Sequence, residues 1–275
     1  IAKKLNCPVS DLKQQITFLK NKHKKNKSIE KENIDYSEKQ INNSFELFNK
    51  ENLLKLIEEE ITKYHFKDKN LKMTTFLTSV SSLLNNPKRR MSLQITGKTA
   101  EGKDNLMKAV LRNIPKPSFK FITSGTQAVL EDDLKDISLL VISEINLFKD
   151  FGANKHLLEV IKQRTEGGVT AVKKDLREQN QEVRVSESEQ QSVIFGTTDV
   201  ETDEELNTRV MKGTIKSSPE KIKFVNENTF DLFSNENLIL KDSKESDNFI
   251  RIALTEFQKN KNIDIVIPYA ELLKQ

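Results

Sequence analysis

A segment near the middle of the chain has the spacing of a phosphate-binding loop. Residues 97–103 are G-K-T-A-E-G-K and fit the pattern G-x-x-x-x-G-K. In such a loop the glycines let backbone N–H groups surround phosphate oxygens, the lysine reaches the outer phosphates, and the next helix contributes a favourable dipole. We therefore expect nucleotide phosphates to bind here; the alternative is an ordinary turn that contains glycine. The expected contacts are Gly97, Lys98, Thr99, Ala100, Glu101, Gly102, Lys103 and Asp104.

The residue after the lysine departs from this pattern. A Ser or Thr would ligate Mg²⁺ at that position, but the chain has Asp104. A second nucleotide-binding motif, a buried strand that ends in two acidic residues, is altered too, because the apolar run 139–142 is followed by Ser143 and Glu144. One hydroxyl and one carboxylate are thus kept with their positions exchanged. We expect Asp104 and Ser143 to be neighbours around Mg²⁺; the alternative is independent loss of both motifs.

Four further residues are candidates for the hydrolysis of a bound nucleotide. Glu144 could orient or deprotonate the attacking water; the alternative is a surface charge at a strand end. Thr197 and Thr198 end another apolar run, where a polar side chain could bind the γ-phosphate or water. Arg209 could reach the nucleotide of a neighbouring subunit as an arginine finger.

Short apolar runs that alternate with helical patterns predict the elements that position these residues. Such alternation is typical of an α/β domain with a largely parallel sheet and helices on both faces. Strands are expected over 91–96, 119–123, 138–143 and 192–197, and helices over 105–111, 128–134 and 156–164. An insert over 167–185 alternates in two halves and predicts a β-hairpin, with Lys173, Lys174 and Arg177 as candidate DNA contacts. Nearby acids largely cancel this positive charge.

The N-terminal third is predicted to be helical and begins with a basic segment. Residues 1–27 hold eight lysines and one aspartate, and their apolar spacing has the outline of a helix-turn-helix, as do many ordinary helical hairpins. Residues 37–86 show two amphipathic helical stretches, 45–61 and 76–84. We expect three parts: a basic segment 1–27, a linker and helical region 28–90, and a nucleotide-binding core 91–275.

Composition excludes several other classes of protein. The chain has 275 residues, 36% of them hydrophobic, and no apolar run reaches the roughly 18 residues that span a bilayer. The single cysteine, Cys7, excludes an intramolecular disulfide framework, and the three histidines are far apart in sequence. We expect a cytoplasmic protein without membrane contact.

In their order along the chain, these features resemble the ATPase module of AAA+ helicase-like proteins. Most similar is the helicase-like part that accompanies DNA primases in bacteria, phages and archaeal elements, a relative of the minichromosome-maintenance helicases. The resemblance covers roughly residues 5–275, is weakest over 30–85, and is carried best by 97–103 and by Val266–Leu273 (V-I-P-Y-A-E-L-L). It implies an ATP-driven ring, a homo-oligomer expected to be a hexamer. Single-stranded DNA would pass through its channel, with the hairpin facing the channel and Arg209 acting in trans. It also implies a small helical lid beyond Gln275.

These inferences favour an ATP-hydrolysing motor domain of a DNA-replication helicase or primase-helicase, with ATP and Mg²⁺ as cofactors. Two alternatives stay open. One is a degenerate nucleotide-binding scaffold or regulator without turnover, and the other is a replication initiator that binds DNA through its basic N-terminal region.

Overall fold

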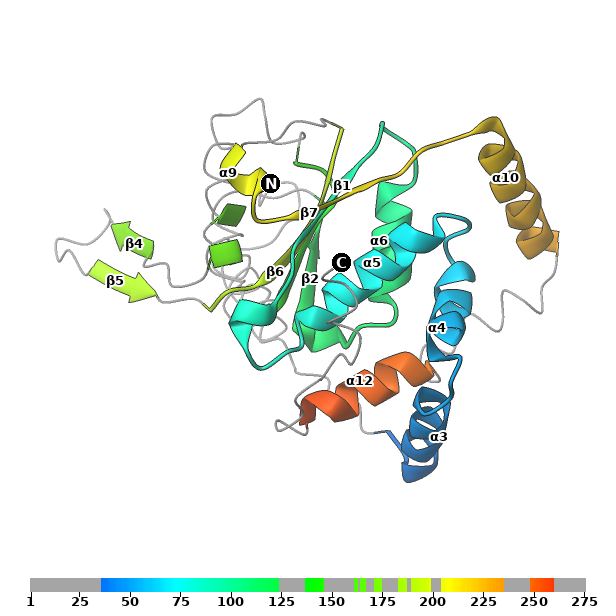
Figure 1. Cartoon of the computed structure of the whole chain (residues 1–275), viewed down its shortest axis with the longest axis horizontal. Helices are drawn as coiled ribbons and strands as arrows, with labels where there is room; N and C mark the ends of the chain where they lie inside the picture. Colours follow the sequence, from blue (N-terminus) through cyan, green and yellow to red (C-terminus); the bar gives the residue numbers. More distant parts are fainter. Residues whose placement is uncertain are drawn as a thin grey trace, which may run out of the picture. The chain divides into compact units, whose positions relative to one another are not determined.

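The described part of the chain is built around a five-stranded parallel sheet (Figure 1). The computed structural model describes residues 36–123, 137–145, 161–162, 164–166, 171–174, 183–186, 189–198, 204–234 and 248–259, which all belong to one compact unit, Tyr36–Gln275. The strands are β1 (Leu93–Thr96), β2 (Phe119–Ile122), β3 (Leu139–Ile142), β6 (Ser192–Thr197) and β7 (Met211–Thr214). Their order across the sheet is β2-β3-β6-β1-β7. The predicted α/β class and parallel sheet are confirmed.

Alternate side chains of the central strands enter two separate hydrophobic clusters. Leu139 and Val141 of β3 belong to one cluster, whereas Leu140 and Ile142 belong to the other. Successive side chains of a strand point to opposite faces, so the clusters mark the two faces of the sheet. Because β3 is buried on both faces, its sequence is continuously apolar rather than alternating.

Helices cover both faces, as the sequence predicted. On the first face, Leu106 and Val110 of α6 (Lys103–Leu111) share a cluster with β1 and β3. On the second face, Leu206 of α9 (Glu204–Asn207) packs with β3 and β6. Figure 1 shows α6 and α9 on opposite sides of the sheet.

The N-terminal helices belong to the same core as the sheet. They are α3 (Glu38–Phe48), α4 (Leu53–Thr62) and α5 (Lys69–Ser81), followed by the short 3-10 helix η1 (Pro87–Arg89). Ile57 and Ile61 of α4 and Phe76 of α5 share the first cluster with β1. The stretch 45–61, predicted as one amphipathic helix, is broken after Phe48. Turn-forming polar residues occupy positions 49–52 (N-K-E-N), which explains the break.

Several elements were not predicted from the sequence. They are η2 (Lys116–Ser118), the edge strand β7, α10 (Pro219–Ser234) and α12 (Phe249–Lys259). β7 was missed because its sequence, M-K-G-T, is short and mostly exposed, without an apolar run. Phe249 and Phe257 of α12 make edge-to-face contacts with Phe48 of α3. The predicted helix 128–134, the basic segment 1–27 and the stretch 266–273 lie outside the described residues. Within the described residues, no helix is long and apolar enough to cross a membrane.

The strand order defines where a ligand is expected. From β1 the chain crosses to β2 in one direction along the sheet, and from β6 it crosses to β7 in the other direction. Neighbouring strands whose connections leave in opposite directions open a crevice at their carboxyl ends, and ligands of open α/β sheets bind there. In this chain the crevice lies between β1 and β6, directly where the loop 97–102 begins.

Candidate phosphate-binding site

The loop 97–102 joins the carboxyl end of β1 to the N-terminus of α6. Two glycines make its path possible. A Cβ at Gly97 would lie 2.4 Å from Cγ2 of Ile215, and Gly102 has a φ of 94°, which favours glycine. The strand–loop–helix arrangement that the motif requires is therefore present, with α6 starting at Lys103.

Lys103 is buried at the centre of the site. Its ammonium donates hydrogen bonds to the carbonyl oxygens of Gly97 (2.6 Å) and Lys98 (3.1 Å), and it forms an ion pair with Oε2 of Glu144 at 3.1 Å. Its side chain is only 6% exposed. A buried ammonium needs such partners because its transfer from water is costly. The fold thus holds a positive charge inside the loop, where outer phosphates of a nucleotide would lie.

Glu144 is the second charged group of the site. It follows β3 and is 16% exposed, and its Oε1 is buried without a hydrogen-bond partner. A carboxylate oxygen of this kind can accept a proton or a hydrogen bond from water. This geometry is compatible with the role predicted for Glu144, and it places the carboxylate in a direct ion pair with Lys103.

The two altered motif positions meet directly. The hydroxyl of Ser143 donates to the carboxylate of Asp104, with Oδ1 and Oδ2 each 2.7 Å away. The two residues, expected from the sequence to be neighbours around Mg²⁺, are in direct contact although 39 positions separate them. The reason is topological, because α6 follows β1 and β3 lies two strands away in the same sheet.

These oxygen atoms fit a hard cation that is only partly held by protein. Mg²⁺ is typically bound through one or two carboxylates, with phosphates and water completing its octahedron. Asp104 supplies one carboxylate, which the Ser143 hydroxyl orients. In the described part of the chain, no group of three or more His, Cys, Asp or Glu side chains is arranged to hold a metal by itself. The donor set therefore fits Mg²⁺ that arrives with a nucleotide.

The neighbouring strand β6 completes the floor of the site. The backbone N–H of Gly97 donates to the carbonyl of Thr197 (3.1 Å), so the end of β6 is tied to the start of the loop. A Cβ at Gly196 would lie 2.1 Å from the carbonyl oxygen of Ser143 and 3.4 Å from Cε of Lys103. Glycine is therefore required there for close packing. The structure brings Thr197, which is buried, beside the loop, and Thr198 follows it at the exposed strand end.

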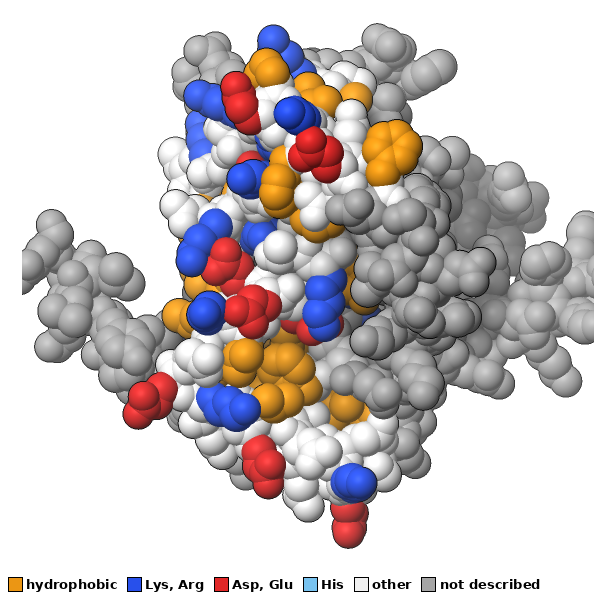
Figure 2. All heavy atoms as spheres, turned by 90° about the vertical axis from the view of Figure 1, so that its right-hand side faces the viewer, with side chains coloured by type: hydrophobic (Ala, Val, Ile, Leu, Met, Phe, Trp, Pro, Cys, Tyr) orange, Lys and Arg blue, Asp and Glu red, His pale blue; other side chains and the backbone are white. Residues whose placement is uncertain are grey.

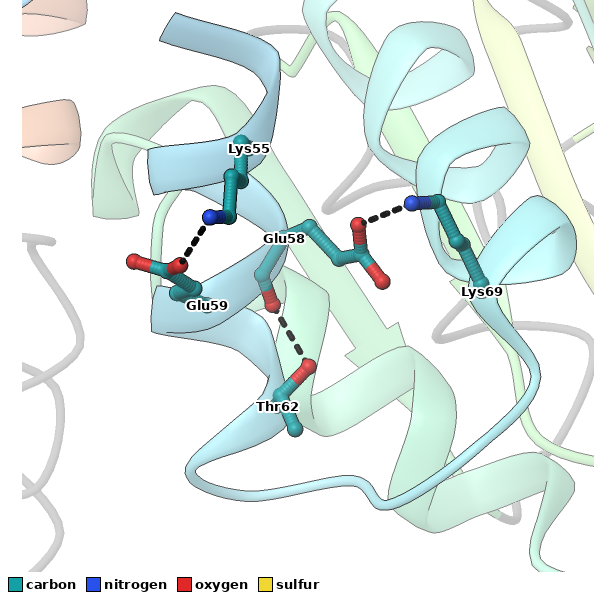
Figure 3. A pocket seen from close by; sticks show the side chains of 5 residues that line it. All are labelled: Lys55, Glu58, Glu59, Thr62 and Lys69. Carbon is teal, nitrogen blue, oxygen red and sulfur yellow. Dashed lines mark hydrogen bonds and ion pairs between the residues drawn. The ribbon is translucent and has the colours of Figure 1, made fainter. Parts of the chain in front are cut away.

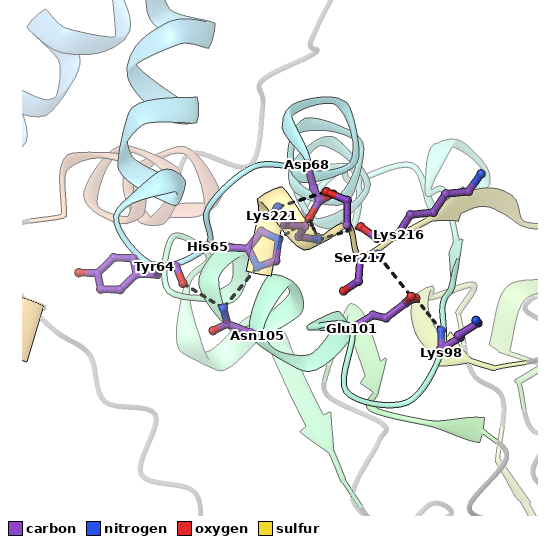
Figure 4. Close-up of polar contacts among 10 residues, drawn as sticks. Tyr64, His65, Asp68, Lys98, Glu101, Asn105, Lys216, Ser217 and Lys221 are labelled. Carbon is purple, nitrogen blue, oxygen red and sulfur yellow. Dashed lines mark hydrogen bonds and ion pairs between the residues drawn. The ribbon is translucent and has the colours of Figure 1, made fainter. Parts of the chain in front are cut away.

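The loop also contains the carboxylate of Glu101, which the sequence analysis named only as one of the expected phosphate contacts. Oε2 of Glu101 accepts a hydrogen bond from the backbone N–H of Lys98 (2.7 Å), and Oε1 accepts one from Ser217 (3.4 Å). These contacts fold the loop against the segment that follows β7 (Figure 4). One loop N–H is thus already bound to a negatively charged group.

A cluster that sequence reasoning missed lies behind the loop (Figure 4). It consists of His65 and Asp68 from the turn between α4 and α5, Asn105 from α6 and Lys221 from α10. The ring of His65 lies 3.7 Å from the position of a Cβ on Gly102. Burial lowers the pKa of His65 below its ordinary value of 6.5, although Asp68 opposes this effect. The sequence contains no motif that would connect these residues, because Lys221 is 153 positions from its partner Asp68.

Arg209 does not belong to this site. It lies between α9 and the start of β7, whereas the loop lies at the carboxyl end of the sheet. With about 3.3 Å per strand residue, the two ends are roughly 15 Å apart. Arg209 forms ion pairs with Glu166 (2.5 Å) and Glu205 (2.7 Å). Its ion-pair partners are therefore not residues of the loop.

The predicted hairpin is present as an antiparallel pair of strands. β4 (Ala171–Lys174) pairs with β5 (Val183–Ser186), and Lys173 lies opposite Arg184 in the register. The pair is inserted between β3 and β6 and is separate from the main sheet. Arg177 lies outside the described residues.

Two other surface features do not add to the site. A hollow of about 430 Å³ between α4 and α5 is lined by residues that mostly pair with one another, such as Lys69 with Glu58 at 2.8 Å (Figure 3). Figure 2 shows that the face on the right of Figure 1 mixes both signs of charge with hydrophobic patches. The described residues of this face therefore lack the one-sign surface that binds a nucleic-acid backbone. Exposed hydrophobic side chains on α4 and α10 are Leu54, Ile222, Phe224 and Phe230.

Comparison with known proteins does not assign the chain to a family. No model of a known protein family matches the sequence, and a search of curated proteins finds no match. The functional argument therefore depends on the geometry of the site.

Proposed function

We propose that this chain binds ATP together with Mg²⁺ through residues 97–104 and hydrolyses it. The observation that carries the proposal is the buried Lys103 ammonium within the loop, 3.1 Å from Glu144 and at the carboxyl ends of the sheet. A positive charge, a helix N-terminus and a carboxylate that can receive a proton are, together with Mg²⁺, recurring parts of sites for phosphoryl transfer to water. All three converge on one crevice.

Each residue of the site would have a separate role. Lys103 would exchange its two carbonyl partners for oxygens of the β- and γ-phosphates, and the backbone N–H groups of the loop would bind the same phosphates. Glu144 would orient a water molecule in line with the γ-phosphorus and take its proton as the new P–O bond forms and the bond to the ADP oxygen breaks. Thr197, at the end of β6, would hold the γ-phosphate or the attacking water.

Asp104 would hold Mg²⁺ together with the phosphates and water, and Ser143 would orient the Asp104 carboxylate through its hydrogen bond. When bound, the metal neutralises the negative charge of the phosphates. Because Asp104 is itself negative and close to the loop, we expect nucleotide binding to depend more strongly on Mg²⁺ than it would with a hydroxyl at this position.

We further propose that ATP hydrolysis powers a motor domain of a DNA-replication helicase or primase-helicase. The support is the resemblance of the sequence, together with two features of the chain. The β4–β5 pair brings Lys173 and Arg184 opposite each other on an insert outside the main sheet, which suits contact with a DNA backbone. Arg209 lies too far from its own loop, so a catalytic role would require a neighbouring copy, as in a homo-oligomeric ring such as a hexamer.

One observation favours a second function, a nucleotide-dependent scaffold without turnover. Asp104 and Glu101 place two carboxylates in or beside the loop, and one of them already binds the N–H of Lys98. Extra negative charge weakens phosphate binding and slows hydrolysis. In this second function the site would bind a nucleotide to stabilise an assembly.

The decisive experiment measures ATP binding by calorimetry for the parent, Lys103→Ala and the matched control Lys98→Ala. Both variants lose one positive charge from the loop, but Lys98 is exposed whereas Lys103 is buried among its partners. We expect Lys103→Ala to weaken binding by 100-fold or more, on the order of the 3 kcal/mol of a lost charge-assisted contact, and Lys98→Ala to change it only a few-fold. Equal affinities in all three proteins would refute the phosphate-loop proposal. The rate of ATP hydrolysis, measured with and without single-stranded DNA, then distinguishes a motor domain from a scaffold without turnover.

A further inference from the structure

We propose that the chain of contacts Lys221–Asp68–His65–Asn105 positions the start of α6, and thereby couples α10 to the phosphate-binding loop. The inference rests on the proposed nucleotide binding and names how that site would be regulated. These four are positioning residues, because they act on the loop through Gly102 and the first turn of α6. Figure 4 shows them side by side, from three elements that are distant in sequence.

The contacts form a continuous path. Lys221 of α10 forms an ion pair with Oδ2 of Asp68 at 2.6 Å. The same oxygen lies 2.9 Å from Nε2 of His65. On the other side of the ring, Nδ1 lies 3.3 Å from the amide nitrogen of Asn105, which also donates to the carbonyl of Tyr64 at 3.1 Å. Asn105 stands in the first turn of α6, two residues after Lys103.

This geometry specifies the protonation state of the histidine. The amide nitrogen of Asn105 only donates hydrogen bonds, so Nδ1 of His65 must be the acceptor. Nε2 then carries the proton and donates a hydrogen bond to the carboxylate of Asp68. A proton on Nδ1 would oppose the Asn105 amide, and a flip of that amide would turn its oxygen toward the Tyr64 carbonyl. The path to α6 is thus intact only with a neutral ring.

Burial makes each link of the path dependent on the others. The side chains of His65, Asp68 and Lys221 are 4%, 15% and 12% exposed. Removal of one partner from a buried charged pair leaves the other uncompensated, which is strongly destabilising. The turn is also strained, since Lys67 and Asp68 have φ values of 65° and 51°. Such conformations persist only where surrounding contacts impose them.

The charged groups around His65 predict how it responds to α10. Asp68 raises its pKa, whereas Lys221 and the buried Lys72 of α5 lower it. A displacement of α10 that removes Lys221 would free Asp68 for His65 alone, raise the pKa of the ring and loosen the Asn105 contact. Movement of α10 would therefore change the affinity of the loop.

The experiment compares Lys221→Met with Lys223→Met in the full chain. Lys223 is on the same helix but is 78% exposed and pairs only loosely with Glu227 (3.9 Å), so it is a matched control for loss of charge. The measurements are the pKa of His65 by NMR, hydrogen exchange of the Gly102 amide, and the dissociation constant of ATP. Three histidines in the sequence keep the assignment simple. Lys221→Arg retains the charge and serves as the rescue.

We expect Lys221→Met to raise the pKa of His65, to speed exchange at Gly102, and to weaken ATP binding about fivefold to tenfold, with Lys223→Met unchanged and Lys221→Arg close to the parent. An unchanged His65 pKa and Gly102 exchange rate in Lys221→Met would overturn the coupling, whatever happens to ATP. If the pKa of His65 and the exchange rate of Gly102 shift while neither the parent nor Lys103→Ala binds ATP, the contact path is supported. In that case the proposed function fails.

Discussion

Replacement of Asp104 by threonine separates two explanations of the altered motifs. If the hydroxyl and the carboxylate have exchanged places, Asp104→Thr leaves two hydroxyls, at positions 104 and 143, and removes the carboxylate that would hold Mg²⁺. If both motifs have simply decayed, the same change removes a repulsive charge from the phosphate site. The two explanations predict opposite effects on Mg²⁺-dependent hydrolysis.

The size of the effect follows from the contacts of Asp104. Its carboxylate accepts the Ser143 hydroxyl at 2.7 Å, a charge-assisted hydrogen bond worth about 1.5–3 kcal/mol when buried. Loss of a group that holds or orients a metal ligand commonly lowers metal affinity or activity by about 10- to 100-fold. We therefore expect Asp104→Thr to raise the Mg²⁺ concentration for half-maximal hydrolysis by about 10-fold or more.

The assay is a Mg²⁺ titration of ATP hydrolysis for the parent, Asp104→Thr, Ser143→Asp and the double variant. If the hydroxyl and the carboxylate have exchanged positions, the double variant regains one of each. Its Mg²⁺ concentration for half-maximal hydrolysis should then return to within a few-fold of that of the parent. Ser143→Asp alone places a second carboxylate against Asp104 and should be slow, because like charges at this distance repel. Faster hydrolysis by Asp104→Thr than by the parent would refute the exchange.

Three further predictions follow from single contacts. Glu101→Gln should tighten ATP binding about fivefold in calorimetry, because a carboxylate about 4 Å from a phosphate costs about 1 kcal/mol even in water; unchanged affinity would mean that the carboxylate turns away when ATP binds. Gly196→Ala should lower the free energy of unfolding by about 1–3 kcal/mol in urea titrations, since its Cβ meets the Ser143 carbonyl. Gly213→Ala should cost less, because its Cβ meets only the side-chain end of Leu71, and an equal loss would contradict this reasoning. Burial lowers the pKa of His65 in the folded chain, so the unfolded chain binds the proton more readily; stability should fall as the pH drops below 6.5, and less steeply in His65→Gln.

The sequence alone determined the local parts of the site. Residues 97–103 predict a strand–loop–helix unit because glycines are needed where backbone approaches a ligand or adopts a positive φ, and Gly102 does so. The apolar run 139–142 predicts a buried strand because both of its faces are covered. The contact between Asp104 and Ser143 was expected from the motif pattern, in which the residue after the lysine lies beside the end of a second buried strand.

Other features depended on contacts that local patterns do not encode. β7 is exposed and contains glycine, and it is a strand only because β1 offers a free edge for hydrogen bonds. Arg209 was a candidate by its place in the sequence, and only the strand direction puts it at the opposite end of the sheet from the loop.

The cluster behind the loop shows most clearly which contacts depend on the tertiary structure rather than on local sequence. His65 lies in the turn between α4 and α5, Asn105 on α6 and Lys221 on α10. No spacing rule relates them, because their distances are decided by the packing of these elements. Sequence periodicity specifies which face of a helix is buried, but not which polar side chains meet where buried faces end. The glycine-containing loop 97–102 is therefore a property of the sequence, whereas the contacts that hold the first turn of α6 in place are decided by the tertiary structure.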